Sequence, residues 1–259
     1  LKTILNPGDE VITFAPYFGE YRSYTANYDI NTYTIKYLEV EGATFTNAPA
    51  TYTALDIVVI PNPTKIGYLF KGWSGTGING IKKDVVIEAG SAGNRVYTAE
   101  WEAINYSITY DLNSGRVSGI NPATYTVESA DFSVLNPGRA GYDFEGWTLS
   151  IVDFIWSNGT IGENGGIADG AGYYSMIVSL KANTTYTFAD NVKLAVYKTD
   201  GTFIGFSEYG SYTATEDCVC SVVVGAMTED ELKSVAIVAD GNVANVTIPR
   251  GNMGSLKLV

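Results

Sequence analysis

Several acidic side chains are adjacent in the chain, and paired carboxylates are the usual catalytic groups of glycoside hydrolases. Glu216 and Asp217 are neighbours, as are Glu229, Asp230 and Glu231. Neighbouring residues point to opposite faces of a strand and to diverging directions on a helix, so these carboxylates cannot converge on one bond. We therefore predict that they are surface residues, and no general acid and base can be named among them.

Calcium binding and thiol chemistry are two further possibilities. Asp111, Asn113 and Gly115 in DLNSG have the spacing that opens a calcium loop, but no glutamate stands twelve residues along to complete it. A turn is therefore the preferred interpretation. Cys218 and Cys220 are separated by one residue. A bond between them would close a small strained ring, so two free thiols are expected.

The composition excludes most other chemistry. The 259 residues contain no histidine, which removes Ser-His-Asp and Cys-His nucleophiles and histidine-ligated zinc. Sixteen Lys and Arg against 28 Asp and Glu give a net charge of -12, which repels nucleic acid and anionic membranes. No apolar run approaches the ~18 residues of a membrane span. We expect no catalytic residue, cofactor, metal site, nucleic-acid partner or membrane span.

Aromatic side chains are the remaining candidates, because exposed aromatic faces can stack on sugar rings. Five of them stand out between residues 150 and 240: Trp156, Tyr173, Tyr174, Tyr209 and Tyr212. The alternative is that they are core or interface residues, since a chain with 19 tyrosines must bury many of them. If they bind sugars, they must converge on one exposed face, and the acidic balance favours neutral over anionic glycans.

An internal duplication organises much of the chain around these residues. Tyr33 and Pro49 match Tyr106 and Pro122, and both pairs are 73 residues apart. After a one-residue slip, NPTKIGYLFKGW matches NPGRAGYDFEGW. A shared GYxFxGW with the same upstream NP and PATYT indicates two copies of one repeat.

The GYxFxGW motif is expected to supply the core of each copy. Around its glycine bend, Tyr68, Phe70 and Trp73 can share one core face. Large aromatic residues dominate the cores of small modules, so Trp73 and its equivalent Trp147 are predicted to be buried rather than to stack on a ligand.

The second copy is interrupted. The first copy runs on to Trp101, whereas the chain leaves the pattern after Trp147 and returns near its end. There NVTIPRGNMGSLKLV aligns with DVVIEAGSAGNRVYT at an offset of 161 residues. Because exposed loop tips tolerate whole inserted domains, we predict an insertion of about 90 residues, roughly 150 to 240. The strand near 243–259 is expected to return to the sheet begun by YSITYDL, and the chain to be a segment of a longer product.

These motifs carry a family resemblance. YSITYDLNSG, NPATYTVESADFSVLNP and GYDFEGW, and the first copy with its closing YTAEW, resemble the Listeria-Bacteroides repeat, or internalin B-repeat. The resemblance covers about 33–101, 106–149 and 243–259. It implies small β-grasp-type modules that serve as spacers and adhesive segments on bacterial surface or secreted proteins. The first copy departs from the pattern at LEVEG, which makes its first hairpin turn less defined.

The inserted segment is predicted to hold at least five strands, enough for a β-sandwich. Asp200-Gly201 between LAVYKT and TFIGFS indicates a two-residue hairpin turn. MTEDELKS predicts a short helix with Thr228 as N-cap and Glu231 as its capping-box partner. LKANTTYTF and YKTDGTFIG resemble jelly-roll accessory modules of phage tail and gut-bacterial carbohydrate-binding proteins. That resemblance implies a carbohydrate-binding module.

The first 28 residues resemble another family. NPGDEVI, followed by PYF and EYR, is similar to a fold type I pyridoxal-phosphate aminotransferase, in which Phe18 would stack on the cofactor. A strand and then an aromatic stripe at helical spacing fit that segment. The Schiff-base lysine, the aspartate at the pyridine nitrogen and the phosphate cradle of such an enzyme cannot be placed, so we expect a fragment without this activity.

We therefore predict a mainly β fold of α+β modules, in which tandem β-grasp-like repeats carry an inserted antiparallel β-sandwich and follow a short strand-helix segment. The expected function is that of a non-catalytic spacer or adhesin, extracellular or on the bacterial cell surface, with a host or neighbouring surface protein or a neutral glycan as partner. Carbohydrate binding by the insertion is the alternative, and a fragment of a pyridoxal-phosphate enzyme is a minor one. The predicted domains are 1–30, 31–103, 104–149 with 243–259, and 150–242.

Overall fold

The computed structural model describes residues 31–207 and 209–259, which divide into two compact units between Glu102 and Ala103. Strands dominate both units, and the helix α2 is the only helix in these described ranges. The mainly β class is thus confirmed, and the described parts of both repeat copies consist of strands and loops. The strand-helix segment and the aminotransferase resemblance at 1–30 lie outside the described residues.

The first unit is built around a parallel pair of long strands. β1 (Thr32–Leu38) and β6 (Arg95–Ala103) pair in parallel, with Ile35 opposite Arg95. The flanking strands β2 (Thr51–Thr53) and β4 (Tyr68–Gly75) complete a sheet of order β2-β1-β6-β4. A separate two-stranded ribbon is formed by β3 (Val58–Val59) and β5 (Val86–Ile87). The rich supply of Thr, Tyr, Val and Ile in these segments explains why they are strands.

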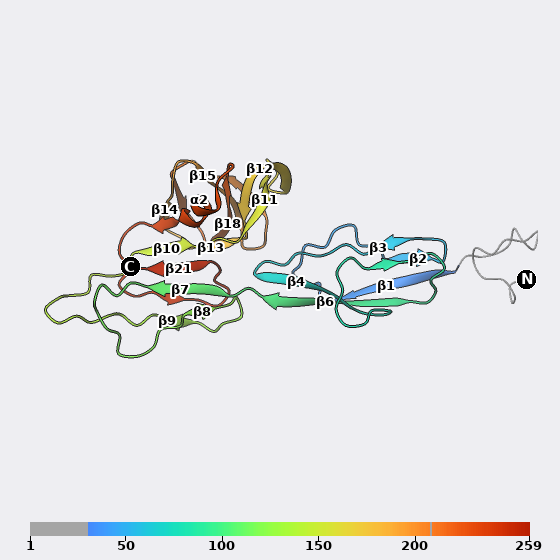
Figure 1. Ribbon diagram of the computed structural model, residues 1–259, viewed down its shortest axis with the longest axis horizontal. Helices are drawn as coiled ribbons and strands as arrows, with labels where there is room; N and C mark the ends of the chain where they lie inside the picture. The colour runs from blue at the N-terminus through green and yellow to red at the C-terminus, as the bar shows by residue number, and fades with distance from the viewer. Residues whose placement is uncertain (1–30, 208) are drawn as a thin grey trace, which may run out of the picture. The chain divides into compact units, whose positions relative to one another are not determined.

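The second unit repeats this plan with distant partners. β7 (Tyr106–Tyr110) pairs in parallel with β21 (Ser255–Leu258), as β1 does with β6. β8 (Thr124–Tyr125) flanks β7 as β2 flanks β1. β9 (Phe132–Ser133) and β20 (Thr247–Ile248) form the equivalent ribbon. The chain between 150 and 240 therefore intervenes between neighbouring strands of one repeat (Figure 1).

The two copies share side-chain hydrogen bonds as well as strands. The Tyr52 hydroxyl donates to the Gly93 carbonyl at 2.6 Å, and the Tyr125 hydroxyl donates to the Gly254 carbonyl at 2.5 Å. A second matched pair is found at the start of the repeat, where tyrosine hydroxyls donate to proline carbonyls at 2.8 Å: Tyr37 to Pro49 and Tyr110 to Pro122. The hydroxyls of these four tyrosines therefore link separate segments within each repeat.

The tryptophan of the GYxFxGW motif is the centre of each core, as predicted. Trp73 and Trp147 are fully buried. The centroid of the Phe70 ring lies 5.4 Å from that of Trp73, and Phe144 has the same distance to Trp147.

The motif tyrosine does not join the core cluster, however: Tyr68 is only partly buried, and the Lys65 ammonium lies 4.8 Å from the centroid of its ring. Its equivalent Tyr142 is exposed. The central carbon of the Arg139 guanidinium lies 4.0 Å from the centroid of the Tyr142 ring, as expected for a cation attracted to an aromatic face.

The inserted segment begins and ends at one backbone pairing. Trp73 and Lys82 exchange two backbone hydrogen bonds in the first copy, where residues 74–81 form the connection. Trp147 and Val243 exchange the same two bonds at 2.9 Å, although residues 148–242 lie between them. The pairing is retained because loop closure costs only about 0.6 kcal/mol for each doubling of loop length.

The insertion does not form both sheets of the predicted β-sandwich by itself, because some of its strands extend the sheet of the second repeat. β10 (Leu149–Val152) follows Trp147 and pairs with β21, so the sheet continues from the repeat into the insertion. Its order is β17-β14-β19-β10-β21-β7-β8, with the added strands β14 (Thr184–Thr187), β17 (Ser211–Ala214) and β19 (Ile237–Ala239). The insertion and the second repeat thus share one sheet.

A second, antiparallel sheet belongs to the insertion alone. It has the order β11-β12-β18-β15-β16, and β13 also pairs with β18. Its strands are β11 (Trp156–Ile161), β12 (Ile167–Ser175), β13 (Val178–Leu180), β15 (Val192–Lys198), β16 (Phe203–Phe206) and β18 (Cys218–Val224). Every residue of β18 except Val223 is buried, which fits a central strand covered on both faces.

The predicted hairpin at Asp200-Gly201 is present and joins β15 to β16, but its turn has three residues rather than two. The Lys198 amide donates to the Thr202 carbonyl and the Gly201 amide donates to the Lys198 carbonyl, so residues 199–201 form the loop, in which Gly201 has a φ of 88° that glycine adopts at little cost. The helix and the free thiols are confirmed as predicted. Helix α2 (Glu229–Ser234) begins with the complete Thr228 and Glu231 capping box. Both cysteines are free and buried on β18.

Candidate functional site

The five predicted aromatic residues lie on more than one surface. In the hairpin of β11 and β12, Trp156 is opposite Ser175 and Tyr174 is opposite Ser157. Residues directly opposite share a face, and successive residues alternate, so Tyr174 lies on the other face from Trp156 and Tyr173. Consecutive tyrosines on one strand therefore cannot form a single stacking platform.

Tyr174 and Tyr209 are brought to the same region of the six-stranded sheet. Val223 is opposite both Tyr174 and Lys193, so these three residues share one face across β12, β18 and β15. The Lys193 ammonium is 4.1 Å from the centroid of the Phe206 ring and 5.9 Å from that of the exposed Tyr209. We call Tyr174, Lys193, Phe206 and Tyr209 the aromatic face.

Sequence reasoning missed two members of this face. Lys193 and Phe206 both lie next to the Asp200-Gly201 hairpin, where Ala195 is opposite Phe206. Alternation along LAVYKT and TFIGF would have placed Phe206 on the same side as Ala195, and Lys193 is two residues before Ala195. The register of that hairpin, read from the sequence, could therefore have placed Lys193 and Phe206 on one face.

Tyr212 is separate from the aromatic face. It lies on β17 in the seven-stranded sheet, opposite Tyr186. Burial, followed by the nearby Cys218, raises the pKa of Tyr212 to about 12, so its hydroxyl stays protonated at neutral pH. Of the five predicted residues, Tyr174 and Tyr209 therefore belong to the aromatic face, Trp156 and Tyr173 share the opposite face of the β11 and β12 hairpin, and Tyr212 lies on the other sheet.

The adjacent carboxylates have structural partners. Asp217 accepts hydrogen bonds from the Ala182 amide at 2.9 Å and the Lys181 ammonium at 3.1 Å, which lower its pKa. Glu231 accepts from the Thr228 amide and hydroxyl, which lower its pKa in the same way. Both carboxylates are therefore ionised acceptors, a poor starting point for a general acid.

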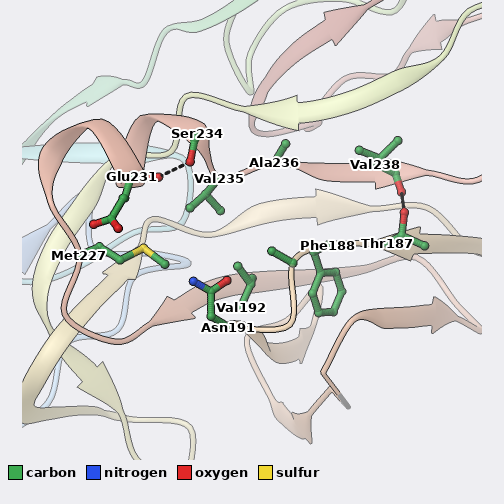
Figure 2. Close-up of a pocket in the computed structure, with 11 residues that line it drawn as sticks. Thr187, Phe188, Asn191, Val192, Met227, Glu231, Ser234, Val235, Ala236 and Val238 are labelled. Atoms are coloured by element: carbon green, nitrogen blue, oxygen red, sulfur yellow. Dashed lines mark hydrogen bonds between the residues drawn. The ribbon is translucent and has the colours of Figure 1, made fainter.

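An open groove of about 510 Å³ lies between α2 and the turn from β14 to β15. Figure 2 shows Met227 and the Glu231 carboxyl on one side, with Phe188 and Asn191 on the other. The groove is bounded by the Thr187 hydroxyl, which donates to the Val238 carbonyl at 3.4 Å. The Glu231 carboxylate in this groove is engaged in the capping box of α2. The rest of the lining is mostly apolar, so the groove presents no carboxylate that is free to act in catalysis.

Residues 31–207 and 209–259 contain no group of three or more His, Cys, Asp or Glu side chains placed to hold a metal ion. Asp111 instead accepts a hydrogen bond from the Asn113 amide at 3.0 Å, which is the expected turn.

The matched geometry of the two copies agrees with a comparison against protein families. The family model of the Listeria-Bacteroides repeat domain matches residues 33–88 and 106–152. The chain therefore contains a repeated β-rich domain similar to that family in two places. The family match ends at 152, close to β10, where the inserted strands begin.

Two proteins of Evansella cellulosilytica are similar to part of the chain. One, whose name includes the words Gly-rich membrane protein, is 25% identical over 128 residues, which are 47% of this chain and 14% of that protein. The other, named as a membrane protein, is 26% identical over 122 residues, or 47% of this chain and 18% of that protein. The chain thus matches less than a fifth of the length of either relative.

No solved structure matches the chain, so the likeness of the insertion to jelly-roll modules stays a prediction. Among the described residues, no helix is sufficiently long and apolar to cross a membrane.

Proposed function

We propose that this chain is a non-catalytic spacer segment of a larger bacterial surface or secreted protein. The observation that carries the proposal is the position of the first and last strands of each copy. β1 opens the first repeat and β6 closes it, and the two strands are parallel neighbours. β7 and β21 have the same relation in the second repeat.

This arrangement suits a segment held under tension. Pulling on the ends of a repeat draws its first and last strands in opposite directions along their own axes. The hydrogen bonds between two parallel strands then resist together rather than one after another. In the second repeat, β7 and β21 also close off the insertion, because residues 111–254 lie between these strands in sequence. Tension would therefore pass through β7 and β21 and leave the insertion folded.

Single-molecule pulling on the two ends of the chain tests this proposal. We expect two main unfolding events, one for each repeat, and release of the inserted residues only after β7 and β21 separate. A control with one attachment point moved to Glu163, in the turn between β11 and β12, brings the insertion under tension and should show its own event. An early event of the insertion's length in the end-to-end experiment would contradict the proposal.

Glycan binding by the insertion is the second candidate, favoured by the aromatic face. Tyr174, Phe206 and Tyr209 offer apolar rings near a lysine donor, the combination by which sugar rings are held. The acidic net charge favours neutral glycans, as the sequence predicts. An adhesive role on a host or neighbouring cell surface would follow from such binding.

A glycan array probed with the whole chain tests the second candidate. We expect binding to neutral glycans that falls by at least about tenfold in a Tyr209→Ala variant, the loss of about 1.4 kcal/mol of binding free energy. Tyr212→Ala is the matched control, because Tyr212 lies on the other sheet. Equal loss in both variants, or no binding to any glycan, would count against this site.

A further inference from the structure

The ribbon of β3 and β5 in the first repeat is apolar on both faces. Its inner face contributes Ile60, Val85 and Ile87 to the core. On its outer face, Val59 is directly opposite Val86, and the exposed fractions of these residues are 63% and 37%.

The outer apolar surface extends beyond this pair. Ile57 precedes β3 on the same side as Val59 and is 66% exposed, and the nearby Leu55 is 51% exposed. We call Leu55, Ile57, Val59 and Val86 the outer patch. None of these four side chains belongs to the core cluster of the first unit.

The second repeat supplies an internal comparison for the outer patch. Its equivalent ribbon, β9 and β20, has the same register, with Ser133 opposite Thr247 where the first copy has Val59 opposite Val86. The two hydroxyl oxygens are 3.2 Å apart and form a hydrogen bond. Asp131 occupies the position of Ile57, and Glu128 that of Leu55. Every residue of the patch is thus polar in the second copy.

This difference concerns one face of the ribbon only. The inner positions stay apolar in both copies, since Val134, Val246 and Ile248 are buried where the first copy has Ile60, Val85 and Ile87. A strand with one solvated face alternates apolar and polar residues, whereas a strand covered on both faces is apolar throughout. The first ribbon has the second pattern, although its outer face is exposed in the single chain.

We propose that the outer patch binds the outer patch of a second copy of this chain. A symmetric contact requires a surface that complements itself, and a patch of uncharged branched side chains meets that requirement. Neither β3 nor β5 pairs with a third strand among the described residues, so the ribbon is also uncovered at its edges.

The distribution of charge favours the first repeat as the place for such a contact. Residues 31–102 contain six Lys and Arg against seven Asp and Glu, a net charge of -1, whereas residues 103–259 contain eight against seventeen, a net charge of -9. Two first repeats therefore repel each other little, and near-neutral surfaces are those that associate most readily.

The size of the patch sets the strength of the contact. Four partly exposed side chains offer on the order of a few hundred Å², well below the ~800 Å² for each partner in a standard stable interface. The association is therefore weak for molecules free in solution. It becomes effective where many copies are held close together, because a high local concentration multiplies weak contacts.

This inference goes beyond the spacer role, since it gives the first repeat lateral contacts with neighbouring molecules. It is independent of glycan binding, which involves the insertion. The chain can self-associate whatever the pulling experiment shows, so failure of one proposal does not imply failure of the other.

Sedimentation equilibrium of the whole chain, at concentrations up to about 1 mM, is the test. We expect a monomer and dimer equilibrium whose association constant falls at least about tenfold in a variant carrying Val59→Ser and Val86→Thr, the residues of the second copy. Both positions are exposed, so the variant should fold, and unchanged circular dichroism and melting would verify this.

Two controls make the result specific to the patch. Ile120→Asn removes an apolar side chain that is 94% exposed in the second repeat, at the position where the first has Asn47, and should leave the association unchanged. Adding Ser133→Val and Thr247→Val to the polar variant places an apolar pair beside Asp131 and Glu128 in the unit of net charge -9, and should leave the association weak because the rest of the patch stays charged. A wild-type chain that stays monomeric throughout, or an equal loss in the Ile120 variant, would overturn the proposal.

Discussion

Replacing Trp147 with alanine should lower the free energy of unfolding of the second unit by about 3 to 5 kcal/mol. The side chain is fully buried and packs at 5.4 Å against Phe144 and at 6.1 Å against Tyr110, measured between ring centroids. Truncation would remove these contacts and leave a cavity at the centre of the core. Urea unfolding followed by circular dichroism would measure the loss.

Trp73→Ala should have a matching effect on the first unit, because Trp73 is fully buried against Phe70 and Tyr37. The two units are compact and separate in their internal contacts, so each variant should shift one transition. A loss below about 1 kcal/mol in both variants would contradict the assignment of these residues to the cores.

Phenylalanine at the same positions separates packing from hydrogen bonding. The Trp147 indole N–H donates to the Asn136 Oδ1 at 2.9 Å, whereas the buried Trp73 N–H has no hydrogen-bond partner among the described residues. The equivalent Asn62 instead donates to Asp84 at 3.3 Å. Trp147→Phe should therefore cost about 1 kcal/mol more than Trp73→Phe, the usual net value of one hydrogen bond. Equal costs would show that this hydrogen bond contributes nothing.

Replacing Gly75 with alanine should destabilise the first unit by about 3 kcal/mol or more. Gly75 ends β4 with a φ of 131°, and a Cβ at this position would overlap the carbonyl oxygen of Val96 on the adjoining β6. That carbonyl also accepts a hydrogen bond from the Thr76 amide at 3.0 Å, so the backbone cannot move aside freely. Denaturant unfolding of the variant would measure the effect.

Gly80→Ala is the matched control for Gly75. Gly80 has a φ of 79°, but no atom lies within 4 Å of a Cβ built there. Its replacement should cost only the roughly 1 to 2 kcal/mol of a left-handed backbone. If both variants lost the same stability, the close approach of β4 and β6 would not be the cause.

The two copies diverge at the position of Gly75. In the first copy the chain returns from Gly75 to Lys82 within a few residues, and Lys82 pairs with Trp73. In the second copy, Leu149 occupies this position and begins β10, which pairs with β21 on one edge and with β19 on the other. The same position thus precedes a short loop in one copy and an extended sheet in the other.

The sequence by itself determined the features that depend on local or repeated residues. The GYxFxGW motif predicted Trp73 and Trp147 as core residues, because large aromatic side chains in a small module have nowhere else to be buried. Asp200-Gly201 and the Thr228 capping box predicted a hairpin and a helix from interactions within a few residues. The offset of 161 residues brought the last strand back to YSITYDL, which is the parallel pair of β7 and β21.

Only the tertiary structure decided which sheets and faces these elements share. The shared sheet of insertion and repeat depends on β10 pairing with both β21 and β19, and edge pairing between distant segments leaves no mark on local sequence. Tyr174 and Lys193 share a face because both oppose Val223, while Tyr173 lies on the other face. A shift of one residue in strand register reverses every such assignment, and register is set by the partners a strand finds in the folded chain.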